Sequence, residues 1–183
     1  MKKIMFNDKC FLTKMVLEGK KTMTRRITRQ YEVGETIAVM QSYLDILSSP
    51  MTNRKAQEFK EKLKTLYHTD NFKEILDEPG TTNKMFAKAS AMIHYIKITD
   101  MRIERIQDIT DEECLKEGIF IDEEREFVDN NLYAFDVKGK HLPNRWWWPS
   151  AKMAFGNLID RTMGKGTWER NPQVFAYTFK LVK

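Results

Sequence analysis

The sequence predicts an α+β protein, because segments with strand-like alternation and segments with helical periodicity are both present. Residues 174–182 alternate apolar and polar side chains as a half-buried strand does, and strand character also runs through residues 92–106. Residues 50–78 and 150–164 place apolar side chains at helical spacing. Internal repeats and flexible linkers are lacking, so we expect one domain over residues 1–183.

The N-terminal elements are expected to be one short helix and two strands. The helix should begin at Asn7 or Asp8 and end at Gly19, because apolar side chains recur at helical spacing between them. Residues 22–27 are rich in β-branched side chains and predict a strand, and residues 36–43 predict a second one.

The middle of the chain predicts a helical insertion and then a long strand. Residues 50–78 carry one apolar helical face among lysines and glutamates, and this segment ends at Pro79. In residues 92–106, the apolar side chains change parity at Thr99 and Asp100. Such a change predicts a bulge, a bend or a turn in the strand.

The C-terminal third is expected to hold two helices separated by a long irregular stretch. Thr110 can cap a short helix over residues 111–116, whereas residues 118–148 show no regular pattern. Ser150 can cap a longer helix that ends at Gly164.

Charge is distributed unevenly along a chain whose net charge is +5. Residues 1–30 hold nine basic side chains against two acidic ones, and residues 108–129 hold ten acidic side chains against two basic ones. A basic N-terminal region suits a partner that carries phosphate. The alternative is that the two segments face each other and neutralise one another.

The cysteines, the histidines and the N-terminus bear on compartment and cofactors. A basic start without an apolar stretch after it does not form a secretion signal, and no run of 18 apolar residues is present. Cys10 and Cys114 are far apart in sequence and are expected to be small buried side chains. His68, His94 and His141 form no spaced cluster with them, so we expect a cytoplasmic protein without a metal or cofactor.

Residues 19–26 contain the pattern G-x-K-x-x-T-x-R, which resembles the signature of the ASCH family. The surroundings are also similar to that family, because a short helix precedes the pattern and a turn follows it. The matching residues are Gly19, Lys21, Thr24 and Arg26.

The similarity extends over residues 4–43, 92–119 and 150–182. Trp168 and the pair Asn171-Pro172, ahead of the last strand, resemble the longer bacterial members. Residues 44–91 and 120–148 exceed the compact members and are interpreted as insertions.

The resemblance implies a PUA-like fold, a small and mostly antiparallel β-barrel with flanking helices, and handling of RNA or modified nucleosides. Compact members include amidohydrolases that remove the acetyl group of N4-acetylcytidine with a Lys, a Thr and a Glu. Lys21 and Thr24 match the first two, and alignment of the strand-to-helix junction puts Glu117 in the third role. Glu113 and Glu112 are the alternatives if that alignment shifts.

The chemistry of amide cleavage accounts for these residue types. A threonine hydroxyl such as that of Thr24 needs a base, and Lys21 can act as one only if burial or neighbouring cations lower its pKa. Glu117 would pass a proton to the departing amine or orient the water. Residues three apart on a strand point to opposite faces, so Lys21 must lie in an irregular turn after Gly19. The neighbouring cations are Lys20, Arg25 and Arg26.

A second group of residues is expected to contact the nucleoside or RNA through phosphate contacts, stacking and hydrogen bonds. These residues are Arg25, Arg26, Arg29, Tyr43, Lys165, Trp168 and Asn171. Packing is the preferred explanation for the tryptophans at 146–148, and Lys165 can instead cap a helix C-terminus.

Three functions follow as hypotheses: hydrolysis of an N4-acylated cytidine, RNA binding without catalysis, and metal-independent ribonuclease action in the same basic cleft. The alternative for the motif itself is a solvated, lysine-rich loop that enters a strand. An enclosed pocket the size of one base would favour a nucleoside, whereas an open basic groove would favour a polynucleotide.

Overall fold

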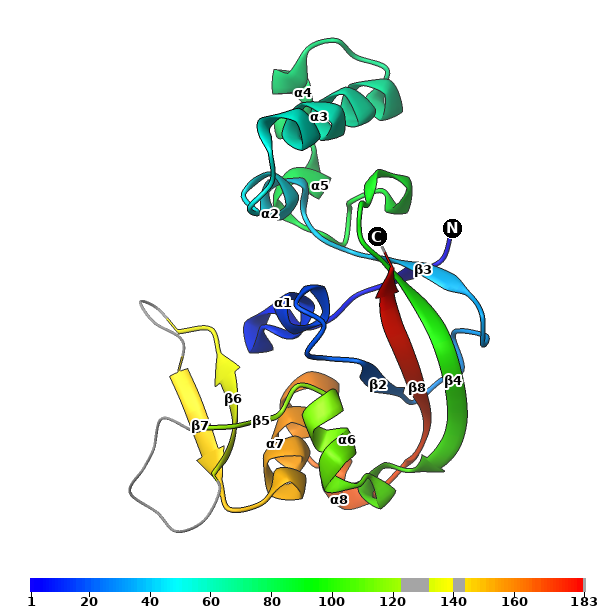
Figure 1. Ribbon diagram of the computed structural model, residues 1–183, viewed down its shortest axis with the longest axis vertical. Helices are drawn as coiled ribbons and strands as arrows, with labels where there is room; N and C mark the ends of the chain where they lie inside the picture. Colours follow the sequence, from blue (N-terminus) through cyan, green and yellow to red (C-terminus); the bar gives the residue numbers. More distant parts are fainter. Residues whose placement is uncertain (123–131, 140–143, 183) are drawn as a thin grey trace. The chain divides into compact units, whose positions relative to one another are not determined.

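The computed structural model describes residues 1–122, 132–139 and 144–182. The described chain is mixed α+β, with eight α-helices, a five-stranded sheet and a three-stranded sheet (Figure 1). This confirms the predicted α+β class. The strands are β1 (Lys3–Ile4), β2 (Met23–Arg26), β3 (Thr36–Val39), β4 (Tyr95–Arg105), β5 (Phe120–Ile121), β6 (Tyr133–Val137), β7 (Asn144–Trp148) and β8 (Gln173–Val182).

The helices follow the predicted pattern of short N-terminal, central and C-terminal elements. They are α1 (Leu12–Leu17), α2 (Tyr43–Leu47), α3 (Asn53–Tyr67), α4 (Phe72–Leu76), α5 (Pro79–Thr82), α6 (Asp111–Lys116), α7 (Ala151–Met163) and α8 (Thr167–Arg170). Among the described residues, none of these helices is long and apolar enough to cross a membrane.

The expected barrel is not found in the part of the chain that is described. The larger sheet has the order β1-β3-β4-β8-β2 and the smaller one the order β5-β6-β7. In each sheet of the described chain, the first and last strands are edge strands that do not pair with each other, so neither sheet closes into a barrel. The chain divides into two compact units, residues 1–6 with 36–96, and residues 7–35 with 97–182. We describe each unit by itself.

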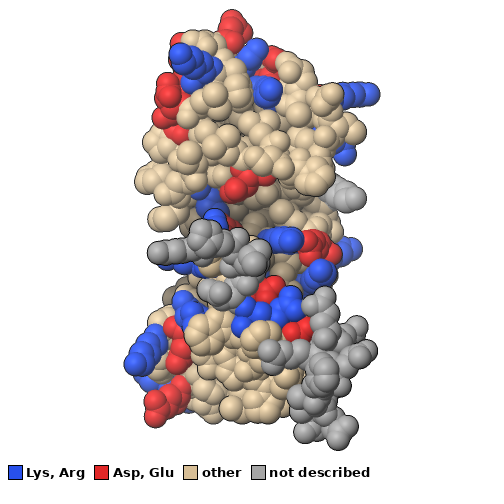
Figure 2. Space-filling view, turned by 90° about the vertical axis from the view of Figure 1, so that its left-hand side faces the viewer, with Lys and Arg blue, Asp and Glu red and all other residues tan. Residues whose placement is uncertain are grey.

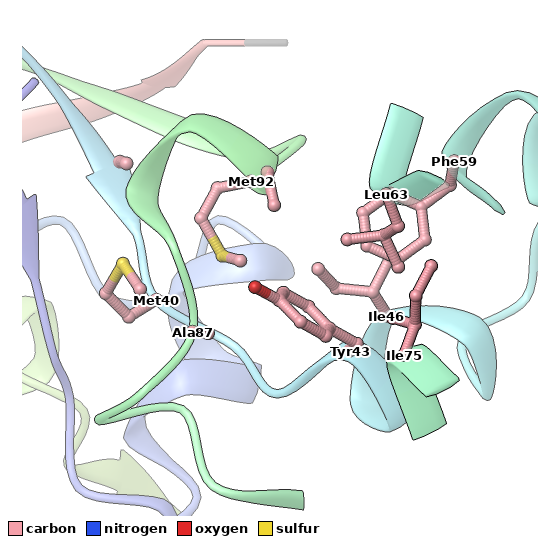
Figure 3. Packing of buried hydrophobic residues seen from close by; sticks show 10 residues of the cluster. Met40, Tyr43, Ile46, Phe59, Leu63, Ile75, Ala87 and Met92 are labelled. Carbon is pink, nitrogen blue, oxygen red and sulfur yellow. The ribbon is translucent and has the colours of Figure 1, made fainter. Parts of the chain in front are cut away.

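The first unit contains the helical segment 44–91 that was interpreted as an insertion. Its short strands β1 and β3 pair in parallel, with Ile4 opposite Val39. The strand predicted over residues 36–43 ends early, because Ser42 forms a capping box with Asp45 and starts α2. Figure 3 shows the core that α2, α3 and α4 share. Its buried members are Ala38, Met40, Tyr43, Ile46, Phe59, Leu63, Ile75, Ala87, Ala91 and Met92.

In the second unit, β2 pairs antiparallel with β8, so that Thr24 lies opposite Tyr177. The predicted caps of the helices are confirmed: the hydroxyl of Thr110 caps α6 and that of Ser150 caps α7. Helix α1 starts later than expected, because the side chain of Asn7 instead caps a 3₁₀ turn over Asp8–Cys10.

Strand β4 continues from Tyr95 to Arg105, so the described chain has no turn at Thr99 and Asp100, and the bulge or bend stays a prediction. The burial along the strand gives another reason for the change in apolar parity. Side chains two apart share a strand face, so Arg102 and Glu104 lie on the face that carries Ile96 and Ile98. On this face, charged residues replace the buried isoleucines.

The expectation that residues 118–148 are irregular is also wrong for the described part. Strands β5, β6 and β7 form an antiparallel sheet, in which Phe135 pairs with Trp146 and Ala134 with Trp147. Three successive tryptophans supply apolar side chains to both faces of β7, so the alternation by which a half-buried strand is recognised is lacking.

Candidate functional site

Lys21 lies in the irregular turn that the sequence predicts. Gly19 has φ +73°, a left-handed value that favours glycine, and it follows α1 directly. The backbone N–H groups of Lys20 and Lys21 both donate to the carbonyl oxygen of Met15, at 2.9 and 3.0 Å. The side chain of Lys21 is only 2% exposed.

Glu117 follows the last residue of α6 and receives the lysine through two of its oxygens. The Nζ atom of Lys21 lies 2.5 Å from carboxylate Oε2 and 2.7 Å from the backbone carbonyl oxygen of Glu117. The N–H of Thr22 donates to the carbonyl of Lys116 at 2.9 Å, so the backbone also ties the motif to the end of α6. This confirms the expectation that Glu117 is close to Lys21.

Arg25 binds the other carboxylate oxygen of Glu117. Its side chain is 0% exposed, and Nη1 donates to Oε1 of Glu117 at 3.0 Å. Nε donates to Glu104 at 2.8 Å and Nη2 to Glu113 at 2.7 Å, so three carboxylates surround one guanidinium. The guanidinium carbon also lies 5.7 Å from the centroid of the Phe155 ring.

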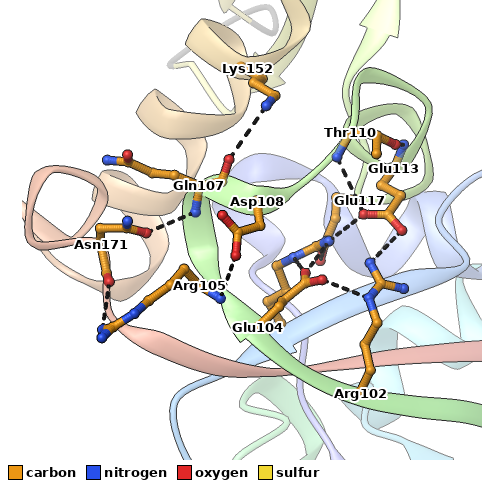
Figure 4. A network of polar contacts seen from close by, with 11 residues as sticks. Arg102, Glu104, Arg105, Gln107, Asp108, Thr110, Glu113, Glu117, Lys152 and Asn171 are labelled. Atoms are coloured by element: carbon orange, nitrogen blue, oxygen red, sulfur yellow. Dashed lines mark hydrogen bonds and ion pairs between the residues drawn. The ribbon is translucent and has the colours of Figure 1, made fainter.

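Arg102 completes the group from β4, with Nε 2.6 Å from Glu104 and with Nη2 on Glu113 (Figure 4). We call these side chains the ionic cluster. It consists of the cations Lys21, Arg25 and Arg102 and the carboxylates Glu104, Glu113 and Glu117. The opposite charges are equal in number, so burial leaves no net charge uncompensated.

The pKa of Lys21 is lowered, first because burial disfavours the ammonium form. Glu117 acts in the opposite direction but does not cancel this effect, and the cations Arg26 and Arg25 lower the pKa further. The expectation that Lys21 is buried and has a depressed pKa is therefore confirmed, whereas its proximity to the hydroxyl of Thr24 stays a prediction.

Burial alone would raise the pKa of Glu117, but Lys21 and Arg25 outweigh it and hold this pKa below its ordinary value. Glu117 is thus a carboxylate at neutral pH. A buried lysine whose pKa is lowered, in contact with a carboxylate that remains ionised, is a perturbation of the kind that clusters at functional sites. Such a pair can serve acid–base chemistry.

Thr24 is buried in β2, three residues after Lys21. Since neighbouring side chains of a strand point to opposite faces, Thr24 shares a face with Arg26 and not with Arg25. Arg26 is one of the cations that lower the pKa of Lys21. Of the two alternative carboxylates, Glu113 binds Arg25 and Arg102, whereas Glu112 is exposed.

The residues expected to bind a nucleoside or RNA are dispersed. Arg29 is exposed and pairs with Glu32 at 2.5 Å, and Lys165 is also exposed. The indole of Trp168 packs edge-on against Phe155 at 5.9 Å, which makes it partly a packing residue.

Asn171 ends α8 with φ 46° and accepts a hydrogen bond from the backbone of Gln107. Tyr43 belongs to the core of the first unit and is 1% exposed. Its hydroxyl lies 2.9 Å from that of Tyr67 and accepts from the N–H of Lys88, and its ring packs edge-on with Phe59 and Tyr67, so it is not accessible for stacking on a base. On the face in Figure 2, basic side chains lie among acidic ones and form no uninterrupted basic area.

A cavity of about 350 Å³ lies in the second unit beside the motif. Its wall combines apolar and charged side chains, of which only Lys20 belongs to residues 19–26. The lining residues are Cys10, Phe11, Lys14, Met15, Glu18, Lys20, Phe120, Asp136 and Arg145. Arg102 and Glu104 were missed as well, although the parity change along β4 was a signal for them.

The chain was compared with protein-family models, with curated proteins and with solved structures. None of these comparisons finds a match. The functional argument therefore rests on the geometry and electrostatics of the residues described above.

Proposed function

We propose that this protein hydrolyses an N-acylated nucleobase, with N4-acetylcytidine as the leading substrate, Lys21 as the base and Thr24 as the nucleophile. The observation that carries this proposal is the state of Lys21. It is 2% exposed, its pKa is lowered, and its Nζ lies 2.5 Å from a buried carboxylate. A lysine that serves only to attract phosphate would lie at the surface and keep its ordinary pKa.

The proposed reaction begins when the neutral amine of Lys21 takes the hydroxyl proton of Thr24. The threonine oxygen then forms a bond to the acyl carbon, and the bond between that carbon and the exocyclic nitrogen breaks as the amine leaves. The proton held by Lys21 passes to this nitrogen, directly or through Glu117. Water then cleaves the acyl-threonine and releases the carboxylic acid.

Arg25 supports this proposal as a positioning residue. By holding Oε1 of Glu117 at 3.0 Å, it leaves Oε2 directed at Lys21. Glu104 and Glu113 hold Arg25 in turn, and Arg102 holds both of them. The base would thus be oriented by charged groups from β2, β4 and α6.

The test measures acetate and cytidine release from N4-acetylcytidine by wild type, Lys21→Arg and Thr24→Ala. Arginine keeps the charge but cannot give up its proton, so Lys21→Arg should lose hydrolysis. Wild-type activity should rise with pH through the apparent pKa of Lys21, because only the neutral amine is a base. Lys180→Arg is the matched control, since it makes the same exchange at an exposed lysine of β8, and it should keep activity.

Retained hydrolysis in Lys21→Arg would overturn the role of the base, and an active Thr24→Ala would overturn that of the nucleophile. The proposal includes the ASCH family and its PUA-like fold as the finer assignment. It is supported by the short helix, the glycine turn and the strand that surround residues 19–26. A binding module would instead tolerate Lys21→Arg and bind RNA, and a ribonuclease would cleave single-stranded RNA without a metal.

A further inference from the structure

We infer that the cavity beside the motif holds the base of one nucleoside, stacked against the rings of Phe11 and Phe120. The inference rests on the proposed function, because it names the form in which the substrate is bound. It differs from that function in concerning residues outside the motif and outside the ionic cluster. Five observations support it: the size of the cavity, its lining, the backbone at Phe11, the platform at Phe120 and the position of Met15.

The size of the cavity fits a single small ligand. A volume of about 350 Å³ is at the lower end of pockets that bind small molecules, so it fits one base better than several. Apolar side chains of Phe11, Met15 and Phe120 contribute much of the wall, and the remainder carries charges of both signs. Apolar walls with a few polar groups suit a planar heterocycle whose edges carry donors and acceptors.

The backbone of Phe11 gives an independent reason to regard its ring as functional. Phe11 has φ 54° and ψ 16°, a left-handed conformation that is unfavourable for a bulky residue and that glycine adopts freely. The conformation is fixed by the chain, since the N–H of Phe11 donates to Asp8 and its carbonyl accepts from Met15. An aromatic side chain at a position that favours glycine indicates a use for the ring, and this ring lines the cavity.

The second aromatic wall is a platform with a fixed guanidinium. The guanidinium carbon of Arg145 lies 5.0 Å from the centroid of the Phe120 ring. Asp136 and Asp122 hold it, at 2.9 and 3.1 Å. Bases stack on aromatic rings and on guanidinium planes alike, so this pair offers a rigid stacking surface.

The rim supplies groups for the edges of the base and for the sugar. Lys20 and Lys14 reach Glu18 at 2.8 and 3.7 Å, and both ammonium groups are well exposed. Exposed ion pairs of this kind contribute little to stability, so a ligand can replace them at small cost.

Met15 connects the cavity with Lys21. A Cβ atom placed on Gly118 would lie 3.3 Å from the sulfur of Met15 and 3.9 Å from Cδ of Lys21. Met15 lines the cavity, and its carbonyl oxygen accepts the backbone N–H of the buried lysine at 3.0 Å. Lys21, Thr24 and Glu117 are buried and are not among the lining residues, so the acyl group of a bound base would have to extend past Met15 to meet them.

The experiment measures binding of cytidine, N4-acetylcytidine and a single-stranded oligoribonucleotide by isothermal titration calorimetry, with wild type and Phe11→Gly. Loss of one stacking partner is worth about 1–3 kcal/mol per base, which is roughly 5- to 150-fold in Kd. We expect the nucleosides to bind Phe11→Gly more weakly by that factor. The variant should remain folded, because glycine adopts this backbone conformation without strain.

His68→Gly is the matched control. His68 also has a left-handed backbone, with φ 53°, but it ends α3 in the first unit. The substitution His68→Gly should relieve the same kind of backbone strain and leave nucleoside binding unchanged. A shared loss of affinity in both variants would overturn the inference, as would an unchanged affinity in Phe11→Gly.

Failure of the inference and failure of the proposed function give different results. Nucleoside binding that depends on Phe11, without any hydrolysis, would support the cavity as a nucleoside-binding site and contradict the proposed hydrolase activity. Hydrolysis by Phe11→Gly with the wild-type KM would support the proposed hydrolase activity and contradict the inference that the substrate binds in the cavity. An oligoribonucleotide that binds wild type more tightly than either nucleoside overturns the inference in favour of polynucleotide binding.

Discussion

Arg25→Gln tests whether the ionic cluster stabilises the second unit. The substitution removes a guanidinium that is 0% exposed and that bonds to three carboxylates at distances from 2.6 to 3.0 Å. Glu104, Glu113 and Glu117 then face only Lys21 and Arg102, so the cluster acquires a net charge of −1, from three carboxylates against two cations.

The expected loss of unfolding free energy in Arg25→Gln is large, because the three carboxylates that Arg25 binds stay buried. Removal of one member of a buried ion pair costs about 3–5 kcal/mol of unfolding free energy, most of it from the charges left without compensation. Arg29→Gln is the matched control: its ion pair with Glu32 is more than half exposed on both sides, so its loss should stay within about 0.5 kcal/mol.

The difference between wild type and Arg25→Gln should depend on pH. In wild type, burial is outweighed by the cations, and the pKa values of Glu113 and Glu117 are lowered. Their contribution is present above the unfolded pKa, about 4.3, and is lost as pH falls through the folded values. In the variant, the loss of a cation raises these folded pKa values, so protonation at acidic pH relieves the repulsion. The difference in unfolding free energy between wild type and Arg25→Gln should be largest near neutral pH and smaller below about pH 5.

Tryptophan fluorescence during urea unfolding measures the right part of the molecule, because all four tryptophans, at 146–148 and 168, belong to the second unit. The midpoint and slope at pH 7.5 and pH 5 give the two free-energy differences. A loss of unfolding free energy below about 1 kcal/mol in Arg25→Gln, or a loss that is the same at both pH values, would refute the argument. Arg25 would then not be needed to compensate the buried carboxylates.

Three further predictions concern other parts of the fold. Gly118→Ala should cost about 1 kcal/mol more than Gly34→Ala in the same urea assay. Both have positive φ, but only at Gly118 would the new Cβ meet a side chain, at 3.0 Å; equal losses would contradict this. Tyr43→Phe removes the acceptor of the Lys88 N–H and should cost about 1–2 kcal/mol, measured as faster amide exchange in the first unit. Burial raises the pKa of Cys114 to about 12, so a thiol reagent at pH 8 should modify it only on unfolding, and rapid reaction of the native protein would disprove this.

The parts of the fold that the sequence predicts correctly depend on neighbours in sequence. The hydroxyl caps at Thr110 and Ser150 act within one helical turn, and the left-handed turn at Gly19 is local too. Burial of Lys21 could be predicted because the proposed chemistry requires it. The approach of Glu117 was expected only through a family resemblance, since 96 residues separate it from Lys21.

Tertiary structure alone decided that Arg25 is buried. Arg25 was expected to meet phosphate, but its three carboxylate partners come from β4 and α6, about 80 to 90 residues further along the chain. Local sequence cannot tell a buried arginine from an exposed one, because both have the same neighbours along the chain. The same holds for the cavity, whose walls combine α1 with the small sheet. The sequence by itself determined the chemical groups and the local turns; long-range pairing determined which groups leave water, and with that their pKa values.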